Sequence, residues 1–423
     1  MQKLNTKRTI LTGLAFLSIC TFWQIYDSII PLILKEGFAI GDTLSGVIMA
    51  LDNVLALFLL PVLGALSDKT HTKLGRRMPY ILAGTACAVV FMMLLPVSAK
   101  ARNLPLFMAA LALTLLSMSL YRSPAVALMP DLTPKPLRSK GNAIINLMGA
   151  VGGVMALGFI TVMVPKTENP DYTAVFAAAA IVMVVSVTIL ALTIRENKMA
   201  VKDEPEEKEM AENAPQRGLS APEKRSLVLI LASVFFWFMG YNAVTTAFSK
   251  YARAYWGLTG GAFAYTLIIA QAAAICAYLP VAALSQRIGR RKTILCGVTG
   301  LTLAFGAAAF FRSFNYGMFA LFALAGISWA AINVNSYPMV VELAKGADVG
   351  KYTGFYYTFS MAAQIITPIL SGFLLENAGY HTLFPYGAVC VAVSFFTMLF
   401  VRHGDAKTEK LSSKLEAFAS PDD

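Results

Sequence analysis

The sequence is poor in charge. Only 14% of its 423 residues are Asp, Glu, Lys or Arg, while 57% are hydrophobic. Soluble globular chains carry about 25% charged residues, so this composition excludes a soluble protein of this length. It indicates an integral membrane protein whose surface faces the lipid bilayer.

Several chemical motifs are also missing. The chain has no HExxH pair and no complete Gly-x-x-x-x-Gly-Lys-Ser/Thr loop, which argues against a zinc hydrolase and against ATP drive. The five cysteines and three histidines show no disulfide or metal spacing. No basic tract with interleaved aromatic residues suggests a nucleic-acid partner. We therefore expect no enzyme activity, no metal and no cofactor.

Long apolar runs fill most of the chain. A helix needs about 20 apolar residues to cross about 30 Å of hydrocarbon. Such runs predict twelve spans, at 9–34, 43–66, 79–97, 105–130, 142–164, 172–194, 226–249, 262–284, 293–311, 316–341, 352–375 and 382–401. The first lacks a small-residue cleavage site and is too long for a signal peptide, so we expect it to be retained. The predicted fold class is an all-α membrane protein with twelve transmembrane helices.

Lys and Arg are distributed unevenly between these spans. With the N-terminus inside, the cytoplasmic segments hold 27 of the 35 basic residues and the external loops hold 7, while Arg122 lies within a span. Because cytoplasmic loops carry the excess of positive charge, we expect both termini in the cytoplasm. We expect a multi-pass, monomeric protein of the cell membrane (inner or plasma membrane), with the lipid bilayer as a partner and no nucleic acid.

A charged segment divides the chain into two halves of six spans. Residues 195–225 contain almost no large apolar side chains and cannot bury a core. We interpret 1–194 as an N-terminal six-helix bundle, 195–225 as a cytoplasmic linker, 226–401 as a C-terminal six-helix bundle and 402–423 as a cytoplasmic tail.

The two halves resemble each other at a nearly constant spacing. The loop after the second span, GALSDKTHTKLGRRMPY, is similar to AALSQRIGRRKTIL after the eighth. The offsets between matching residues are 214 for Gly75 and Gly289, 211 for Asp131 and Glu342, and 213 for Gly141 and Gly354. Such an internal repeat predicts two pseudo-symmetric bundles that rock around a site at the middle of the membrane.

These motifs carry a family resemblance. GALSDKTHTKLGRRMPY resembles the signature loop of the major facilitator superfamily, and its longer Asp-to-Gly spacing is similar to that of the sucrose/proton symporters and the related glycoside-pentoside-hexuronide cation symporters. SPAVALMPDL (123–132) and FWQIYD (22–27) are similar to segments of the same carriers. The resemblance implies a major facilitator fold and transport of a sugar by symport.

The sequence departs from the melibiose-type members of that group. Those carriers have two aspartates before a proline in the second span, whereas Ala56 and Leu60 precede Pro61 here. The sodium-type site is therefore absent, and the resemblance favours a proton over sodium as the coupling ion.

Three ionisable residues lie well inside the predicted spans, namely Asp27, Asp52 and Arg122. Such residues are costly in hydrocarbon and are usually functional. Asp27 and Asp52 lie at similar depths, about 10 and 14 Å from the outer helix ends at 1.5 Å per residue. If they face one cavity, desolvation and mutual repulsion favour proton binding by at least one of them, so we expect both to serve coupling. The alternative is an ion pair with Arg122 that only stabilises the structure.

Polar and aromatic side chains at helical spacing suggest a sugar site, because sugars present hydroxyls over apolar ring faces. Arg122 can donate a fork of hydrogen bonds. The predicted substrate-binding residues are Gln24, Asp27, Asn53, Tyr121, Arg122, Asn242, Trp329, Asn333, Tyr356 and Gln364. Interhelical hydrogen bonds would explain the neutral ones equally well.

The loops between spans are expected to act as gates. In the resembling family, residues of the Asp68 type and the Gly75, Arg76 and Arg77 cluster brace the cytoplasmic side. We assign the same role to Asp131, Arg138 and Glu342 in the loops after the fourth and tenth spans.

The predicted function is import of a disaccharide or other glycoside by proton symport with alternating access. One alternative is a major facilitator exporter that moves drugs or organic anions by proton antiport. An alternative of another class is a membrane sensor or enzyme that does not transport.

Overall fold

The computed structural model describes residues 4–134, 137–167, 169–199, 219–343 and 349–405, and every regular element in these ranges is helical. The helices of the first half are α1 (Thr6–Leu32, continued by the π-turn Ile33–Gly37), α2 (Asp42–Asp68), α3 (Met78–Lys100), α4 (Leu104–Leu132), α5 (Arg138–Met163), α6 (Thr173–Thr193) and α7 (Glu196–Met199). The second half contains α9 (Ala221–Ala254), α10 (Ala264–Ile288), α11 (Arg290–Ala308), α12 (Met318–Glu342), α13 (Val349–Asn377), the 3₁₀ turn Tyr380–Thr382 and α14 (Leu383–Leu399).

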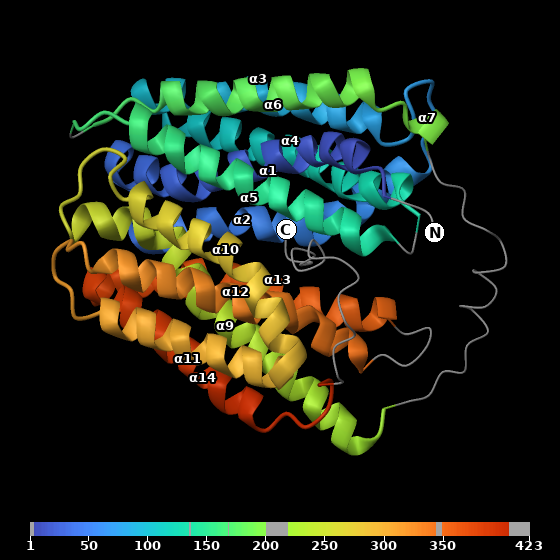
Figure 1. The fold of residues 1–423 in the computed structure, drawn as a ribbon. Helices are drawn as coiled ribbons and strands as arrows, with labels where there is room; N and C mark the ends of the chain where they lie inside the picture. The colour runs from blue at the N-terminus through green and yellow to red at the C-terminus, as the bar shows by residue number, and fades with distance from the viewer. Residues whose placement is uncertain (1–3, 135–136, 168, 200–218, 344–348, 406–423) are drawn as a thin grey trace.

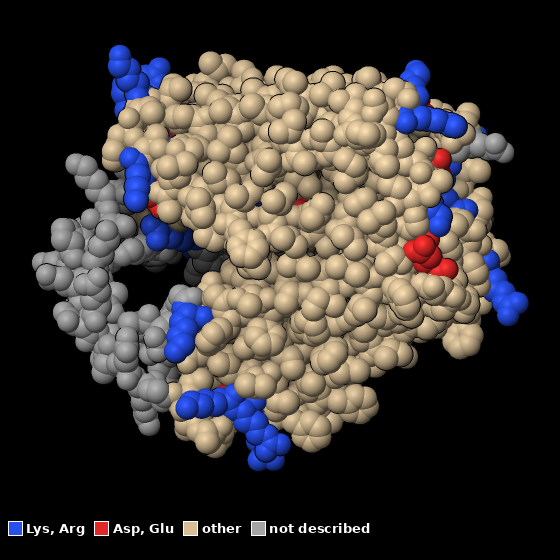
Figure 2. All heavy atoms as spheres, turned by 180° about the vertical axis from the view of Figure 1, so that it is seen from behind, with Lys and Arg blue, Asp and Glu red and all other residues tan. Residues whose placement is uncertain are grey.

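The predicted spans agree with these helices to within five residues at each end. Eleven of the helices are long and apolar enough to cross a membrane. The twelfth long helix of the described residues is α11, which has 19 residues and begins with the cationic run 290–292. Figure 2 shows how charged side chains are distributed on one face of the molecule: they gather at its two ends, and a largely uncharged belt lies between them. The protein is therefore a multi-pass membrane protein.

The helices form two bundles, which lie in the upper and lower halves of Figure 1. In the first, α1 packs on α5 and α6, and α3 packs on α4. In the second, α9 packs on α13 and α14, and α12 packs on α10 and α11. The chain enters α1 and leaves α14 at one end of the molecule, which we call the terminal face; the opposite end is the far face.

The contacts between the bundles follow the internal repeat. The repeat relates α1 to α9, α2 to α10 and α5 to α13. The main interfaces are α2 with α13, α5 with α10, and α1 with α9. The repeat converts the α2–α13 interface into the α10–α5 interface, so these two are equivalent. It converts the α1–α9 interface into itself. The helices and their contacts thus form the predicted all-α arrangement of two pseudo-symmetric six-helix bundles.

Glycines bring the two bundles into backbone contact toward the far face. A Cβ atom on Gly46 of α2 would overlap the backbone of Pro368 in α13, and one on Gly372 of α13 would overlap the backbone of Asp42. The other interface repeats the pattern, because a Cβ atom on Gly261 would overlap the backbone of Ile160. These positions therefore hold the bundles together where larger residues would separate them.

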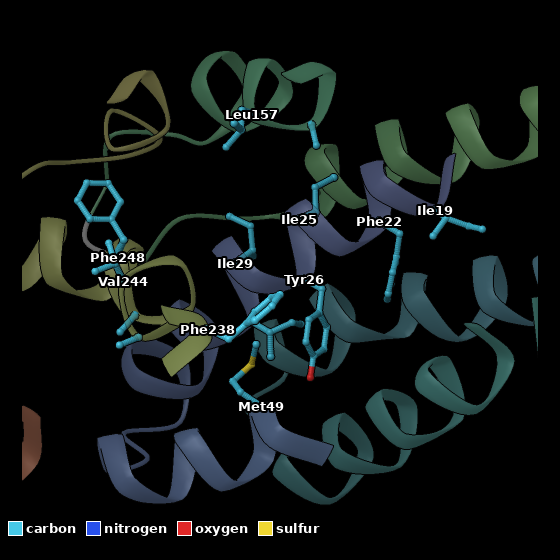
Figure 3. Close-up of a cluster of buried hydrophobic side chains, with 14 of the residues drawn as sticks. Ile19, Phe22, Ile25, Tyr26, Ile29, Met49, Leu157, Phe238, Val244 and Phe248 are labelled. Carbon is cyan, nitrogen blue, oxygen red and sulfur yellow. The ribbon is translucent and has the colours of Figure 1, made fainter. Parts of the chain in front are cut away.

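Figure 3 shows the packing at the centre of the molecule. Tyr26 of α1 lies beside Met49 of α2 and Phe238 of α9, Phe22 lies on the other side of Tyr26, and all four are less than 8% exposed. Phe22 and Tyr26 stack with their ring centroids 6.0 Å apart. This apolar seam joins the two bundles along α1 and α9.

The predicted linker begins later than expected. Glu196 of α7 is only 2% exposed, and its carboxylate accepts backbone N–H bonds from Arg76, Arg77 and Met78 at 3.0–3.1 Å. A carboxylate at this position satisfies donors at the start of α3 and complements the helix dipole. Residues 195–199 thus belong to the first bundle, α9 already begins at Ala221, and 200–218 lie outside the described residues, as does most of the predicted tail.

We expect Glu196→Ala to destabilise the first bundle by about 1.5–3 kcal/mol, because it removes charge-assisted hydrogen bonds to three backbone donors, of which those of Arg77 and Met78 are buried. Chemical unfolding in detergent measures this loss. Glu223→Ala is the matched control, since Glu223 caps the exposed start of α9 and its loss should cost about 1 kcal/mol. Equal losses in the two variants would contradict the role of burial.

Candidate functional site

A central cavity of about 390 Å³ lies between the bundles. Its volume is within the range of small-molecule sites, roughly 300–1,000 Å³. Single helical faces line it. The face of α1 consists of Phe16, Ile19, Cys20, Trp23, Gln24 and Asp27, and that of α10 consists of Leu267, Ala270, Gln271, Ala274, Ile275 and Tyr278. These spacings of three and four residues are those of one side of an α-helix.

Charged side chains come only from the first bundle among the described residues that line the cavity. The Asp52 carboxylate accepts a 2.8 Å hydrogen bond from the amide of Asn53. The Arg122 guanidinium lies 5.7 Å from the ring centroid of Trp23, within cation–π range. Within the described residues no hydrogen bond or ion pair holds the Asp27 carboxylate, although it interacts electrostatically with Asp52. Asp27 is therefore available to a ligand or a proton.

Amides and aromatic rings of the second bundle form the opposite wall. Tyr241 of α9 and Trp329 of α12 stack with ring centroids 3.6 Å apart and planes 5° apart, and Phe238 packs edge-on against Trp329. The Asn333 side-chain oxygen is buried and has no hydrogen-bond partner in the structure. An unpaired buried acceptor costs about 1–3 kcal/mol, so it is a candidate contact for a hydroxyl donor.

Most of the predicted ligands line this cavity. They are Gln24, Asp27, Asp52, Asn53, Arg122, Asn242, Trp329, Asn333 and Gln364. Tyr121 and Tyr356 do not line it. The Tyr121 hydroxyl bonds to Ser18 at 2.6 Å, and that of Tyr356 bonds to Ser336 at 2.9 Å. Both rings are fully buried and tie helices together within one bundle.

Several polar or aromatic residues of the cavity were not among the predicted site residues; they include Trp23, Tyr241, Gln271 and Tyr278. The stripe of α1 could have revealed Trp23, which lies four residues before Asp27 on the same face. Gln271 was detectable as a lone amide in an apolar span, and its side chain donates to the Ala150 carbonyl of the other bundle at 3.4 Å.

A network of charged residues closes the far face. The Asp42 carboxylate, only 1% exposed, accepts bonds from Lys250 of α9 at 2.9 Å, from Lys35 at 2.7 Å and from the Tyr380 hydroxyl at 3.0 Å. The Glu376 carboxylate of α13 accepts the backbone N–H of Thr43 at 2.8 Å. We call these five residues, Asp42, Lys250, Lys35, Tyr380 and Glu376, the far-face gate.

A second ion pair joins the bundles beside this gate. Arg253 of α9 bonds to Glu36 of the first bundle at 2.9 Å and donates to the Tyr172 hydroxyl at 3.2 Å. The far half of α2 is buried against α13 in the same region, whereas Phe58 and Val62 in its terminal half are more than 60% exposed. The cavity is therefore closed toward the far face.

The predicted gating residues of the first bundle form a separate network at the terminal face. Arg77 bonds to Asp68 and, at 2.9 Å, to Asp131, which also pairs with Arg76 at 2.7 Å. Gly75 has a φ of +120°, which favours glycine, and lies against Glu196. These bonds fix α2, α3, α4 and α7 to one another within the bundle.

The remaining predicted gating residues also have partners in their own bundle. Arg138 donates to the carbonyls of Thr133 and Pro130 at 3.2 and 3.1 Å. Glu342 at the end of α12 pairs with Arg290 at the start of α11 at 2.5 Å. The repeat thus carries an ionic contact at the terminal face in both halves.

Comparison with known proteins places the chain in a family. The family model described as MFS/sugar transport protein matches residues 17–403. A crystal structure of a mutant of the nucleoside transporter NupG superposes with a TM-score of 0.69 at 12% identity and covers 93% of this chain and 98% of its own. A crystal structure of the major facilitator transporter FucP in the outward conformation gives 0.59 at 14% identity, covering 94% and 99%. At these identities the likeness shows the fold alone.

We expect Asp42→Asn to open the far face. The substitution leaves the ammonium of Lys250 buried without its counter-charge, and breaking a buried pair costs about 3–5 kcal/mol. A penalty of this size shifts a two-state equilibrium by two orders of magnitude or more. A cysteine at Ala247, which is 4% exposed in the seam, should react with a maleimide at least about 10-fold faster in a background without native cysteines.

Asp171→Asn is the control for this experiment. Asp171 also pairs with a lysine, Lys100, at 3.6 Å, but both side chains are about half exposed or more. Surface pairs contribute about 0–1 kcal/mol, so the reaction rate at position 247 should not change. An unchanged rate in Asp42→Asn would show that the far-face gate does not hold the bundles closed.

Proposed function

Because the chain belongs to the MFS/sugar transport protein family, and is thus a transporter rather than an enzyme, we propose that it imports a sugar by proton symport. The observation that carries the proposal is that the cavity has one charged wall and one neutral wall. One wall bears two carboxylates, of which Asp27 has no hydrogen-bond partner in the described residues, and the other bears amides and a stacked aromatic pair.

The neutral wall supports a sugar as the solute. A pyranose ring has an apolar face that suits the Tyr241–Trp329 pair, and its hydroxyls suit Asn242, Asn333 and Gln364. Arg122 lies on the other wall of the cavity, so its guanidinium could donate two hydrogen bonds to a sugar held against the neutral wall. The cavity carries one cation and two carboxylates, which disfavours the organic anions considered as an alternative.

The charged wall supports a proton as the coupling ion. Two carboxylates that interact within one cavity repel each other when both are ionised, so the site favours uptake of a proton. A bound proton removes the charge that would otherwise oppose movement of the bundles through a closed state. Asp27 and Asp52 are the proposed coupling residues.

Alternating access requires one face of the protein to be cytoplasmic and the other external. The excess of Lys and Arg in the loops of the terminal face supports a cytoplasmic position for that face and for both termini. The closed far face would be external, and the described state would be inward-facing. Release of the solute would precede reopening of the far-face gate, while the terminal-face residues Arg76, Arg77 and Asp131 brace the first bundle.

The experiment that tests the proposal is uptake into proteoliposomes. Labelled disaccharides, monosaccharides, nucleosides and an organic anion would be supplied under an imposed pH gradient, a sodium gradient or neither. We expect concentrative uptake of a sugar with the pH gradient alone. Uptake of a nucleoside or the anion only, or uptake that follows sodium only, would overturn the proposal.

Asp27→Asn should abolish accumulation driven by a pH gradient, because an amide cannot bind and release the proton. Exchange of labelled for unlabelled sugar should persist, since exchange needs no net proton movement. Asp171→Asn at the far face is the control and should accumulate normally. Accumulation at the wild-type level in Asp27→Asn would remove this carboxylate from the mechanism.

Arg122→Ala should weaken sugar binding by about 10- to 100-fold, the loss expected for charge-assisted hydrogen bonds of about 1.5–3 kcal/mol. Arg122→Lys keeps the charge but not the planar guanidinium, so its affinity for the sugar should lie between those of the wild type and Arg122→Ala. Isothermal titration with the transported sugar measures this. If Arg122→Ala bound the sugar normally but unfolded more easily, Arg122 would be a structural residue.

A further inference from the structure

A second and larger hollow lies on the outside of the second bundle, between α11 and α14. It is an open groove of about 1020 Å³, and its apolar walls are formed by Gly306, Ala309, Phe310, Pro385, Ala388 and Val389. Phe310 is 87% exposed and Val389 is 63% exposed. Among the described residues α14 contributes none to the central cavity. The groove therefore faces the lipid.

Cationic and polar groups lie at one end of this groove. Arg312 follows α11, His381 precedes α14, and Tyr255 follows α9, so all three lie at the far face. Within the described residues no hydrogen bond or ion pair engages Arg312 or His381. Tyr316, 80% exposed, follows in the same loop, and exposed Tyr and Trp are typical of the membrane interface.

The depth of the groove matches one leaflet. Val389 lies eight residues after His381, which is about 12 Å along a helix at 1.5 Å per residue. Half of the hydrocarbon thickness is about 15 Å. The cationic end is thus at the level of the lipid headgroups and the apolar walls extend most of the way to the middle of the bilayer.

We propose that this groove binds an anionic phospholipid of the far-face leaflet. The lipid phosphate contacts Arg312 and His381, Tyr255 donates a hydrogen bond near the glycerol, and one acyl chain lies along Gly306, Ala388 and Val389. Guanidinium is the side chain best suited to a phosphate because it donates two parallel hydrogen bonds. The contact bridges α11 and α14 on the face where Phe310 and Val389 are exposed. This site is independent of the solute that the central cavity transports.

Glycine at position 306 leaves the space for the acyl chain. A Cβ atom added there meets no heavy atom within 4 Å. A leucine at this position would extend from open space into the groove and would leave Arg312 and His381 unchanged. This variant separates loss of the apolar contact from loss of charge.

The test is thermal unfolding of the full chain in detergent, titrated with dioleoyl phosphatidylglycerol, with dioleoyl phosphatidylcholine or with sodium phosphate. The wild type should show a saturable rise in Tm of several degrees with phosphatidylglycerol only. The double variant Arg312→Gln/His381→Gln and the single variant Gly306→Leu should lose this rise. Lys166→Gln, which removes another exposed cation of the far face, should keep it. Native mass spectrometry should show one phosphatidylglycerol retained by the wild type and none by the two groove variants.

The outcomes that overturn the proposal are distinct. An equal rise with phosphatidylcholine would show that the charge is not recognised, and a rise with phosphate alone would show an anion site without a lipid. Retention of the lipid by Gly306→Leu would place it elsewhere on the surface. A dimer that forms through this groove and is unaffected by phosphatidylglycerol would identify a second copy of the chain as the occupant.

Discussion

The buried contact between Asp42 and Lys250 is the interaction on which the closed far face depends. It joins α2 of one bundle to α9 of the other across 208 residues of sequence, and it lies where Gly372 allows the backbones of α2 and α13 to touch. Two lysines and a tyrosine bond to one carboxylate, so side chains compensate its charge. Charges buried in this way hold a conformation only while every partner is present, which suits a contact that must open and re-form.

The charged groups of the central cavity are paired less completely than those of the far-face gate. Among the described residues no lysine lines the cavity, and Arg122 lies over the Trp23 ring and interacts electrostatically with Asp52. The far-face gate satisfies its charges internally, whereas within the described part of the chain the Asp27 carboxylate and the Asn333 oxygen of the cavity have no hydrogen-bond partner. Unsatisfied polar groups in an otherwise well-packed interior are expected where a ligand completes the bonds.

Sequence reasoning predicted the helices well and the contacts between them unevenly. Span positions follow from the length of apolar runs, which is a local property, so each of the twelve long helices was predicted. That Gln24 and Asp27 line one cavity was predictable because they share one face of α1. Tyr121 and Tyr356 do not line the cavity, and their hydroxyls bond to neighbouring helices. Spacing along a helix does not show which of these two a hydroxyl reaches. The far-face gate was missed because its partners come from distant segments, and Glu196 was missed because the charged segment around it suggested a linker.

The internal repeat explains how one scaffold can close at either face. Contacts of α2 with α13 and of α5 with α10 are equivalent under the repeat, so a rotation that loosens both at the far face leaves the α1–α9 seam between them in place. That seam is apolar and contains Phe22, Tyr26 and Phe238, which can slide without breaking hydrogen bonds. The terminal-face ion pairs of Arg77 and Arg290 lie within single bundles, so each bundle can move as a rigid unit. The contacts between the bundles at the far face are charge pairs and backbone contacts, which can separate. The contacts within each bundle at the terminal face are salt bridges, which stay in place.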